Sequence, residues 1–175
     1  MVSVPNHLKD CIISNDSHVD EQPLIGVVRC PCGGQTFHIL YPGQTHMHKG
    51  QQIPCTAEID GNFFFLIKAR CISCGKEHLL FDKDYHGWNG FVCHNYAQAS
   101  LPRPDLTPWQ CLSCGGLEHE ASIKIDPVDK ATFVEEAGDE FDEELWPEAF
   151  EWFSMSITCH NCGRQTKDWV SYETA

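Results

Sequence analysis

The pattern of apolar and polar positions predicts short strands rather than long helices. In the stretch "FSMSIT" (153–158), apolar side chains alternate with serine and threonine, and this period of two is typical of a strand with one buried face. Similar short runs occupy 36–40, 65–69 and 121–125. The longest apolar run, "FFFLI" (63–67), is far too short to cross a bilayer. We therefore expect a mostly β fold of antiparallel strands, with no membrane-spanning segment.

A cysteine motif recurs four times between these runs. Eight of the eleven cysteines lie in Cys-x(1–2)-Cys pairs, and each pair is followed directly by glycine. The pairs are Cys30 with Cys32, Cys71 with Cys74, Cys111 with Cys114, and Cys159 with Cys162. Glycine adopts positive φ without a Cβ penalty, which suits a tight turn that aims two sulfur atoms at one metal ion. A single such pair also fits a redox centre, whereas four favour two tetrahedral four-cysteine metal sites.

The compartment decides how cysteines are used. The first twenty residues lack a basic start followed by a long apolar core, so we expect no secretory signal and a cytoplasmic location. Thiols stay reduced in that compartment, and metal binding then becomes the expected use of the paired cysteines.

The flanks of the cysteine pairs repeat as well, and they divide the chain into two similar halves. Each half runs cysteine pair, strand, excursion, strand, cysteine pair, strand. We predict an N-terminal tail (1–25), a first unit (26–99), a proline-rich connector (100–106) and a second unit (107–175) with an acidic insertion (126–151). The arrangement resembles the zinc ribbon, or rubredoxin-like, class in two tandem copies. This resemblance implies that each copy clamps one metal ion at the end of a small antiparallel sheet.

Four half-sites can combine in three ways, and the repeated flanks favour consecutive pairing. Site 1 would then contain Cys30, Cys32, Cys71 and Cys74, and site 2 would contain Cys111, Cys114, Cys159 and Cys162. "CPCGG" has one spacer residue fewer than the other pairs, so Cys55, Cys93 or His94 remain alternative ligands there. We expect two Zn²⁺ ions per chain with structural roles, because four thiolates leave no open position. Iron, as in a rubredoxin-like electron carrier, is the alternative.

The charge of the chain is concentrated in one segment. Of the net charge of −13, residues 106–175 carry −11 (4 Lys+Arg, 15 Asp+Glu), and 11 of those acids lie in 126–151. Such acidity argues against direct contact with nucleic acid phosphates. We expect a short helix at 139–145 that ends before Pro147. The segment is either a solvated element whose aromatics pack on the second unit, or a docking surface for a basic protein. The candidate interface residues are Glu135, Glu136, Asp139, Glu140, Phe141, Asp142, Glu143, Glu144 and Trp146.

A further metal site is a weaker hypothesis. Its candidate ligands are His46, His48, His86, Cys93 and His94, although their spacing does not require a metal. The chain has none of the common hydrolase, metalloprotease, phosphate-loop or dinucleotide motifs. We therefore expect a non-enzymatic zinc-binding protein that acts through protein–protein contacts, inhibitor or immunity proteins being one such type. The alternative is a zinc-ribbon accessory factor of transcription or translation.

Overall fold

The computed structural model describes residues 4–14, 22–94 and 100–175. The fold is mostly β, with 42% of the described residues in strands and 14% in helices. The strands are β1 (Ile12–Ser14), β2 (Leu24–Val28), β3 (Phe37–Tyr41), β4 (Thr45–His48), β5 (Gln51–Pro54), β6 (Ala57–Ile59), β7 (Asn62–Phe64), β8 (Leu66–Cys71), β9 (Glu77–Asp82), β10 (Thr107–Pro108), β11 (Glu118–Asp126), β12 (Trp152–Cys159) and β13 (Gln165–Glu173). The helical elements are η1 (Asn6–Leu8), η2 (Trp88–Val92), α2 (Lys130–Glu136) and η3 (Glu143–Glu148). The alternating runs of the sequence become β3, β8, β11 and β12, as their period of two predicts.

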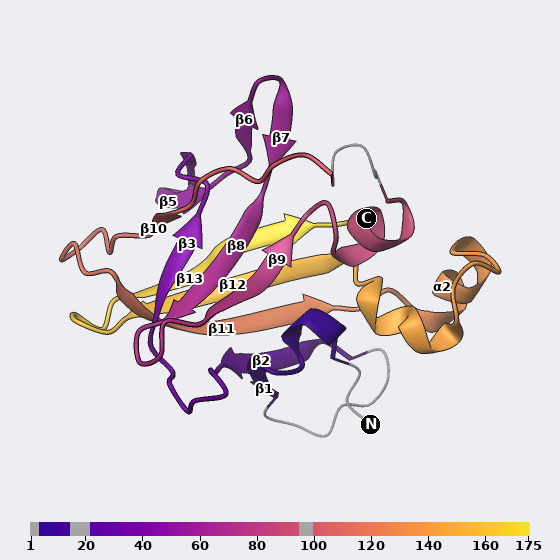
Figure 1. Cartoon of the computed structure of the whole chain (residues 1–175), viewed down its shortest axis with the longest axis horizontal. Helices are drawn as coiled ribbons and strands as arrows, with labels where there is room; N and C mark the ends of the chain where they lie inside the picture. Colours follow the sequence, from indigo (N-terminus) through magenta and orange to yellow (C-terminus); the bar gives the residue numbers. More distant parts are fainter. Residues whose placement is uncertain (1–3, 15–21, 95–99) are drawn as a thin grey trace.

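In the described ranges, nine strands, drawn from both halves, form one antiparallel sheet, and β4–β5 and β6–β7 form two separate hairpins. The order of the large sheet is β1-β2-β11-β3-β8-β9, and β11 also pairs with β12, which pairs with β13 (Figure 1). The short β10 pairs with β3. Thus the strand before the first cysteine pair of each half, β2 or β10, adds to the strand that follows the first cysteine pair of the other half. The halves are interlocked through the sheet rather than joined only by the connector.

The strand registers of the two halves repeat around one central pair. Phe37 and His119 face each other where β3 meets β11. Each of them is also the partner of the first cysteine of a second pair, since Phe37 pairs with Cys71 and His119 with Cys159. This reciprocal pairing gives the sheet an approximate twofold arrangement about the Phe37–His119 pair.

Aromatic side chains fill the space between the two layers of this folded sheet. Phe81 on β9 stacks on Phe153 on β12, with ring centroids 4.7 Å apart. Phe65, which precedes β8, stacks on Tyr172 on β13 at 4.9 Å. Phe65, Phe81 and Phe153 are at most 4% exposed, and they belong to a continuous core built from both halves. Because burial of apolar area is the main favourable term in folding, the two halves stabilise each other.

Each half interrupts its strand order with an excursion at the same place. In the first half the hairpins β4–β5 and β6–β7 lie between β3 and β8. In the second half α2 and η3 lie between β11 and β12, and they project from one end of the sheet (Figure 1). The expected helix at 139–145 is therefore wrong in position. Asp129 begins α2 by accepting a hydrogen bond from the Thr132 N–H, and Asp142 begins η3 by accepting one from the Glu144 N–H.

Pro147 lies inside η3 rather than beyond its end. The turn bonds of η3 are donated by the N–H groups of Leu145 (to Asp142 O, 2.9 Å) and Ala149 (to Trp146 O, 3.1 Å). Neither of these two bonds, which lie at the ends of η3, requires the N–H that proline lacks.

The N-terminal segment that we predicted as a tail contains η1 and β1. β1 pairs with β2 at the edge of the sheet, and Leu8 of η1 is fully buried in the main core. Residues 1–3 and 15–21 of that segment lie outside the described residues. None of the helices among the described residues is long and apolar enough to cross a membrane.

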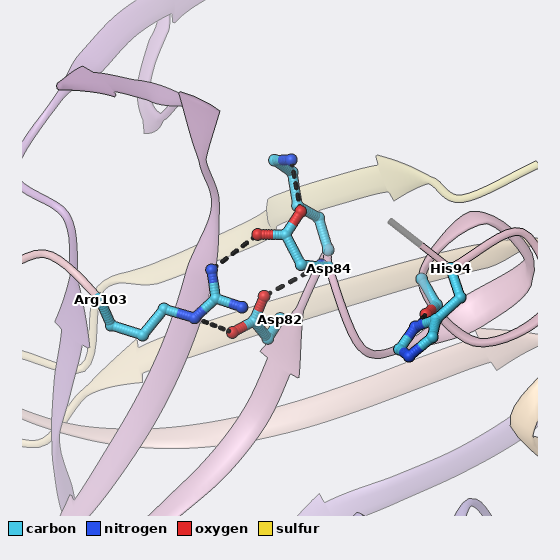
Figure 2. A network of polar contacts seen from close by, with 6 residues as sticks. Asp82, Asp84, His94 and Arg103 are labelled. Atoms are coloured by element: carbon cyan, nitrogen blue, oxygen red, sulfur yellow. Dashed lines mark hydrogen bonds and ion pairs between the residues drawn. The ribbon is translucent and has the colours of Figure 1, made fainter. Parts of the chain in front are cut away.

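The proline-rich connector is attached to the sheet by a buried ionic network (Figure 2). Nε of Arg103 lies 3.2 Å from Asp82 Oδ2, and its Nη1 lies 2.7 Å from Asp84 Oδ2. The Asp84 N–H also donates to Asp82 Oδ1, and Lys83 Nζ lies 2.7 Å from Asp84 Oδ1. Asp82 and Asp84 are only 2% and 6% exposed. Since buried charges need partners, Arg103 fixes the path of the connector against the end of β9.

Candidate metal centres

The four cysteine pairs form turns of one design. The N–H of the first cysteine donates to a carbonyl beyond the turn, and the glycine N–H donates back to the first cysteine carbonyl. The four glycines, Gly33, Gly75, Gly115 and Gly163, have φ between +72° and +93°. The positive φ predicted from the sequence is therefore confirmed, and only glycine adopts it without strain.

The short "CPCGG" pair makes the same turn with one residue fewer. Its glycine bond spans three residues, from Gly33 N–H to Cys30 O, whereas the other turns span four, as from Gly75 N–H to Cys71 O. Gly34 packs against the site, because a Cβ there would lie 2.7 Å from the Cys71 sulfur. Although this pair has one spacer residue fewer, both of its sulfur atoms lie at the first site.

The turns bring the cysteines together in two groups of four. Within each group all four sulfur atoms lie within 4.8 Å of one another. The groups are Cys30, Cys32, Cys71 and Cys74, and Cys111, Cys114, Cys159 and Cys162, so the half-sites meet in the consecutive pairing. Between the half-sites of the first group, the Sγ–Sγ distance is 3.5 Å for Cys30 and Cys74 and 3.6 Å for Cys32 and Cys71. In the second group it is 3.6 Å both for Cys111 and Cys162 and for Cys114 and Cys159. These cysteines are free thiols.

The spacing of the sulfur atoms suits a tetrahedral ion. Four thiolates at a Zn–S distance of about 2.3 Å would lie roughly 3.8 Å from one another. In both groups the first cysteine of each pair is buried and the second is exposed. Each group therefore resembles a closed site at the surface that could hold one ion with four sulfur ligands. The two groups together could hold two ions per chain.

The protonation of the thiols also favours a cation. Burial raises the pKa of Cys71, but hydrogen bonds from the backbone N–H groups of Cys74 and Ser73 and from the Cys32 and Cys74 thiols together outweigh it and bring the pKa to about 7. Cys111 follows the same pattern, with a pKa of about 7. In contrast, burial raises the pKa of Cys30 to about 12. A bound divalent ion would replace the protons that such crowded sulfur atoms otherwise share.

One residue at the first centre was not recognised in the sequence. Nε2 of His78 lies 3.3 Å from the Cys30 sulfur, and the ring packs edge-on against Phe37. With its Nε2 protonated, His78 donates a hydrogen bond to that sulfur and offsets part of the thiolate charge. His78 lies at a buried position of β9. A histidine on the buried face of a strand next to a cysteine pair was the signal that could have identified it.

The five residues proposed for a further metal site are not brought together. Among the described residues, the two cysteine groups are the sets of three or more ligand side chains close enough to share an ion. His46 and His48 lie exposed on β4, whereas His86 is buried and stacks on His7 at 3.6 Å. His94 Nδ1 lies 3.0 Å from Gly90 O in the turn after η2 (Figure 2), and Cys93 beside it is exposed. A joint site of all five is therefore wrong.

Two of the nine residues of the candidate interface set, Phe141 and Trp146, are not exposed, and the other seven are. Trp146 is 5% exposed, and its Nε1 donates to Val128 O at 2.7 Å. Phe141 and Leu145 are half-buried and pack on the same small core, which also contains Phe133. The seven carboxylates of the set are all exposed; they are Glu135, Glu136, Asp139, Glu140, Asp142, Glu143 and Glu144. We refer to these seven residues as the acidic face.

Comparison with protein-family models, with curated proteins and with solved structures gives no match. What can be said of function therefore rests on the two cysteine centres and on the surfaces around them.

Proposed function

We propose that the protein is a zinc-stabilised, non-enzymatic scaffold whose acidic face binds a basic protein. The zinc assignment is supported by the donor set, since four thiolates in a tetrahedral arrangement are the usual structural zinc site. All four coordination positions would be filled by the protein. An ion held in this way has no position for substrate or water, so its contribution is to stability.

The observation that carries the proposed interaction is the separation of apolar and acidic side chains in segment 126–151. Its aromatic side chains Phe133 and Trp146 are buried in a small core of their own. The seven carboxylates of the acidic face remain exposed on α2, η3 and the turn between them. The segment thus presents a charged surface rather than an apolar one, and this favours a partner of opposite charge.

Stability does not explain this arrangement of charge. Glu135 and Glu136 lie in the last turn of α2, where the helix dipole disfavours negative charge. In the described part of the chain, the acidic face forms one ion pair, between Lys130 and Glu143 at 2.7 Å. A concentration of uncompensated acids costs folding free energy and instead raises the association rate with a basic protein.

The test is a comparison of two variants with the same change in charge. The first carries Glu136→Gln, Glu140→Gln and Glu144→Gln on the acidic face. The control carries Glu58→Gln, Asp60→Asn and Glu173→Gln, three exposed positions outside segment 126–151. We expect the wild-type chain and the control to capture the same basic protein from extracts of the source organism, and the first variant to lose it. Equal capture by both variants, confirmed with the purified partner, would refute the acidic face as the interface.

Two further measurements separate the alternatives. Retention on heparin together with a salt-sensitive gel shift would favour a nucleic-acid-associated factor. Elemental analysis that returns iron with visible charge-transfer bands would favour an electron carrier. We expect two zinc ions per chain and no retention on heparin.

A further inference from the structure

A cavity of about 610 Å³ opens between the β4–β5 hairpin and β13. It is independent of the acidic face and of both cysteine centres. The hairpin belongs to the first half of the chain and β13 to the second, so the cavity exists because the halves are interlocked. Gln51 Nε2 donates to Lys167 O at 3.2 Å and holds the hairpin against β13. A volume of this size is within the range of small-molecule sites.

One wall of the cavity is aromatic and held in place. Phe65 is buried and stacks on Tyr172, and both line the cavity. Trp152 also lines it, and its Nε1 donates to Ser171 Oγ at 2.9 Å. Ile53 adds an aliphatic contact from the hairpin side. Flat rings fixed in this way form a surface on which a planar ligand can stack with little loss of side-chain entropy.

The rim of the cavity is cationic, in contrast to the chain as a whole. His46, His48, Lys49 and Lys167 line it, with Asp168 as the one lining residue that is acidic. The chain carries 25 acids against 12 Lys+Arg, so an excess of basic side chains around one cavity departs from its overall balance. Neither lysine has an ion pair with a carboxylate that the structure describes. Two ammonium groups over an aromatic wall suit an anion.

The backbone of β13 is irregular at two of the rim residues, Lys167 and Asp168. The register between β12 and β13 shifts between Met155 and Ile157, so β13 has extra residues there and forms a bulge. Within the bulge Asp168 has φ of +49°, and its N–H donates to Ser156 Oγ at 3.0 Å. Bulges redirect side chains and are frequent beside functional sites. A left-handed residue other than glycine costs free energy and is a second indication of a functional constraint.

We propose that this cavity binds a small organic anion with a planar aromatic part. The ring system would stack against Trp152 and Tyr172, and the anionic group, a phosphate, sulfonate or carboxylate, would lie between Lys49 and Lys167. His46 and His48, which the sequence singled out as metal ligands, belong to this rim instead. The hairpin and the bulge thereby acquire a role that the cysteine centres do not require.

The test uses a matched pair of fluorescent probes on the zinc-loaded chain. Anilinonaphthalene sulfonate carries both a flat ring system and an anion, and phenylnaphthylamine is its uncharged parent. We expect saturable binding of the sulfonate at one site, at least tenfold tighter than that of the parent. The double variant Lys49→Gln, Lys167→Gln should weaken sulfonate binding at least tenfold. The control Lys9→Gln, Lys124→Gln, at two exposed lysines outside the cavity, should change it less than twofold.

The location of the probe is measured without any substitution. Cys55 is half-buried and lines the cavity, whereas Cys93 is exposed and does not. Saturating sulfonate should slow alkylation of Cys55 by iodoacetamide at least fivefold and leave Cys93 unaffected. Absence of saturable binding up to about 1 mM, a limit of roughly −4 kcal/mol, would overturn the proposal. So would binding that ignores the two lysines or leaves Cys55 unprotected.

Discussion

The buried network at Arg103 gives the most direct test of how this fold is held together. We consider Arg103→Met, which removes the guanidinium group and keeps an aliphatic stem of similar length. The substitution also removes two ring contacts of the guanidinium carbon, which lies 4.9 Å from the centroid of the Tyr85 ring and 5.8 Å from that of the Phe64 ring. The substitution leaves Asp82 without its partner at 3.2 Å, while Asp84 keeps Lys83 at 2.7 Å.

The expected loss follows from burial and from the partners that remain. Breaking a buried ion pair on one side costs about 3–5 kcal/mol, since the other charge stays buried. Only Asp82 is left without a cation, and it still accepts the Asp84 N–H at 3.0 Å. We therefore expect the lower end of the range, about 3 kcal/mol at pH 8. For a chain of 175 residues this corresponds to a fall in Tm of roughly 6–12 °C.

The pH dependence identifies the group responsible. Burial raises the pKa of Asp82 in the wild-type chain, and the Arg103 charge opposes this shift. Without Arg103 the folded-state pKa of Asp82 rises further above its unfolded value. A carboxyl shifted in this direction destabilises the fold when ionised, so stability is lost as pH rises through the folded pKa. The deficit of the variant should thus be largest near pH 8 and should shrink toward about pH 6.

The assay is denaturant unfolding of the zinc-loaded chain at both pH values. The matched control is Arg70→Met, because Arg70 pairs with Glu77 at 3.5 Å on the surface, where the side chains are 44% and 43% exposed. That pair should contribute about 0–1 kcal/mol. The double variant Arg103→Met, Asp82→Asn should recover part of the loss. A deficit no larger than that of the control, or one that is equal at both pH values, would refute the reasoning.

Three further predictions concern the cysteine centres and the acidic segment. Cys71→Ser should lower the zinc content from two ions to one and abolish cooperative unfolding, since a structural zinc contributes on the order of 10 kcal/mol; Cys55→Ser should retain two ions by elemental analysis. Gly34→Ala should weaken only the first site in chelator competition, because its Cβ would lie 2.7 Å from the Cys71 sulfur; equal affinity at both sites would contradict this. Trp146→Ala should lower the free energy of unfolding, measured with denaturant, by about 3–5 kcal/mol, because the residue is only 5% exposed. A loss below about 1 kcal/mol would mean that the small core around Trp146 is not formed.

Local patterns were sufficient for the cysteine turns and for the main strands. The glycine after each pair indicates a turn of positive φ, because the steric limit on φ acts within one residue. The period of two in 153–158 predicts which side chains are buried, and Phe153, Met155 and Ile157 are at most 2% exposed. The helix in the acidic segment was misplaced because the caps at Asp129 and Asp142 were not recognised.

These local patterns could not predict contacts between segments that are distant in the sequence. His78 reaches Cys30 across 48 residues, and Arg103 reaches Asp82 across 21. Neither pair has a characteristic spacing, since the chain between them follows its own excursions. The aromatic and basic lining of the cavity likewise combines residues of β4, β12 and β13 with Phe65, which precedes β8.

The sequence by itself determined the chemistry of this protein: eight cysteines in four turns, strands with one buried face, and an acidic segment. Only the tertiary structure decided how these parts meet, with β2 on β11, β10 on β3, and the two halves in one sheet around Phe37 and His119. The physical reason is that alternation specifies which face of a strand is buried but not which strand covers it. That choice depends on the register and packing of the whole chain.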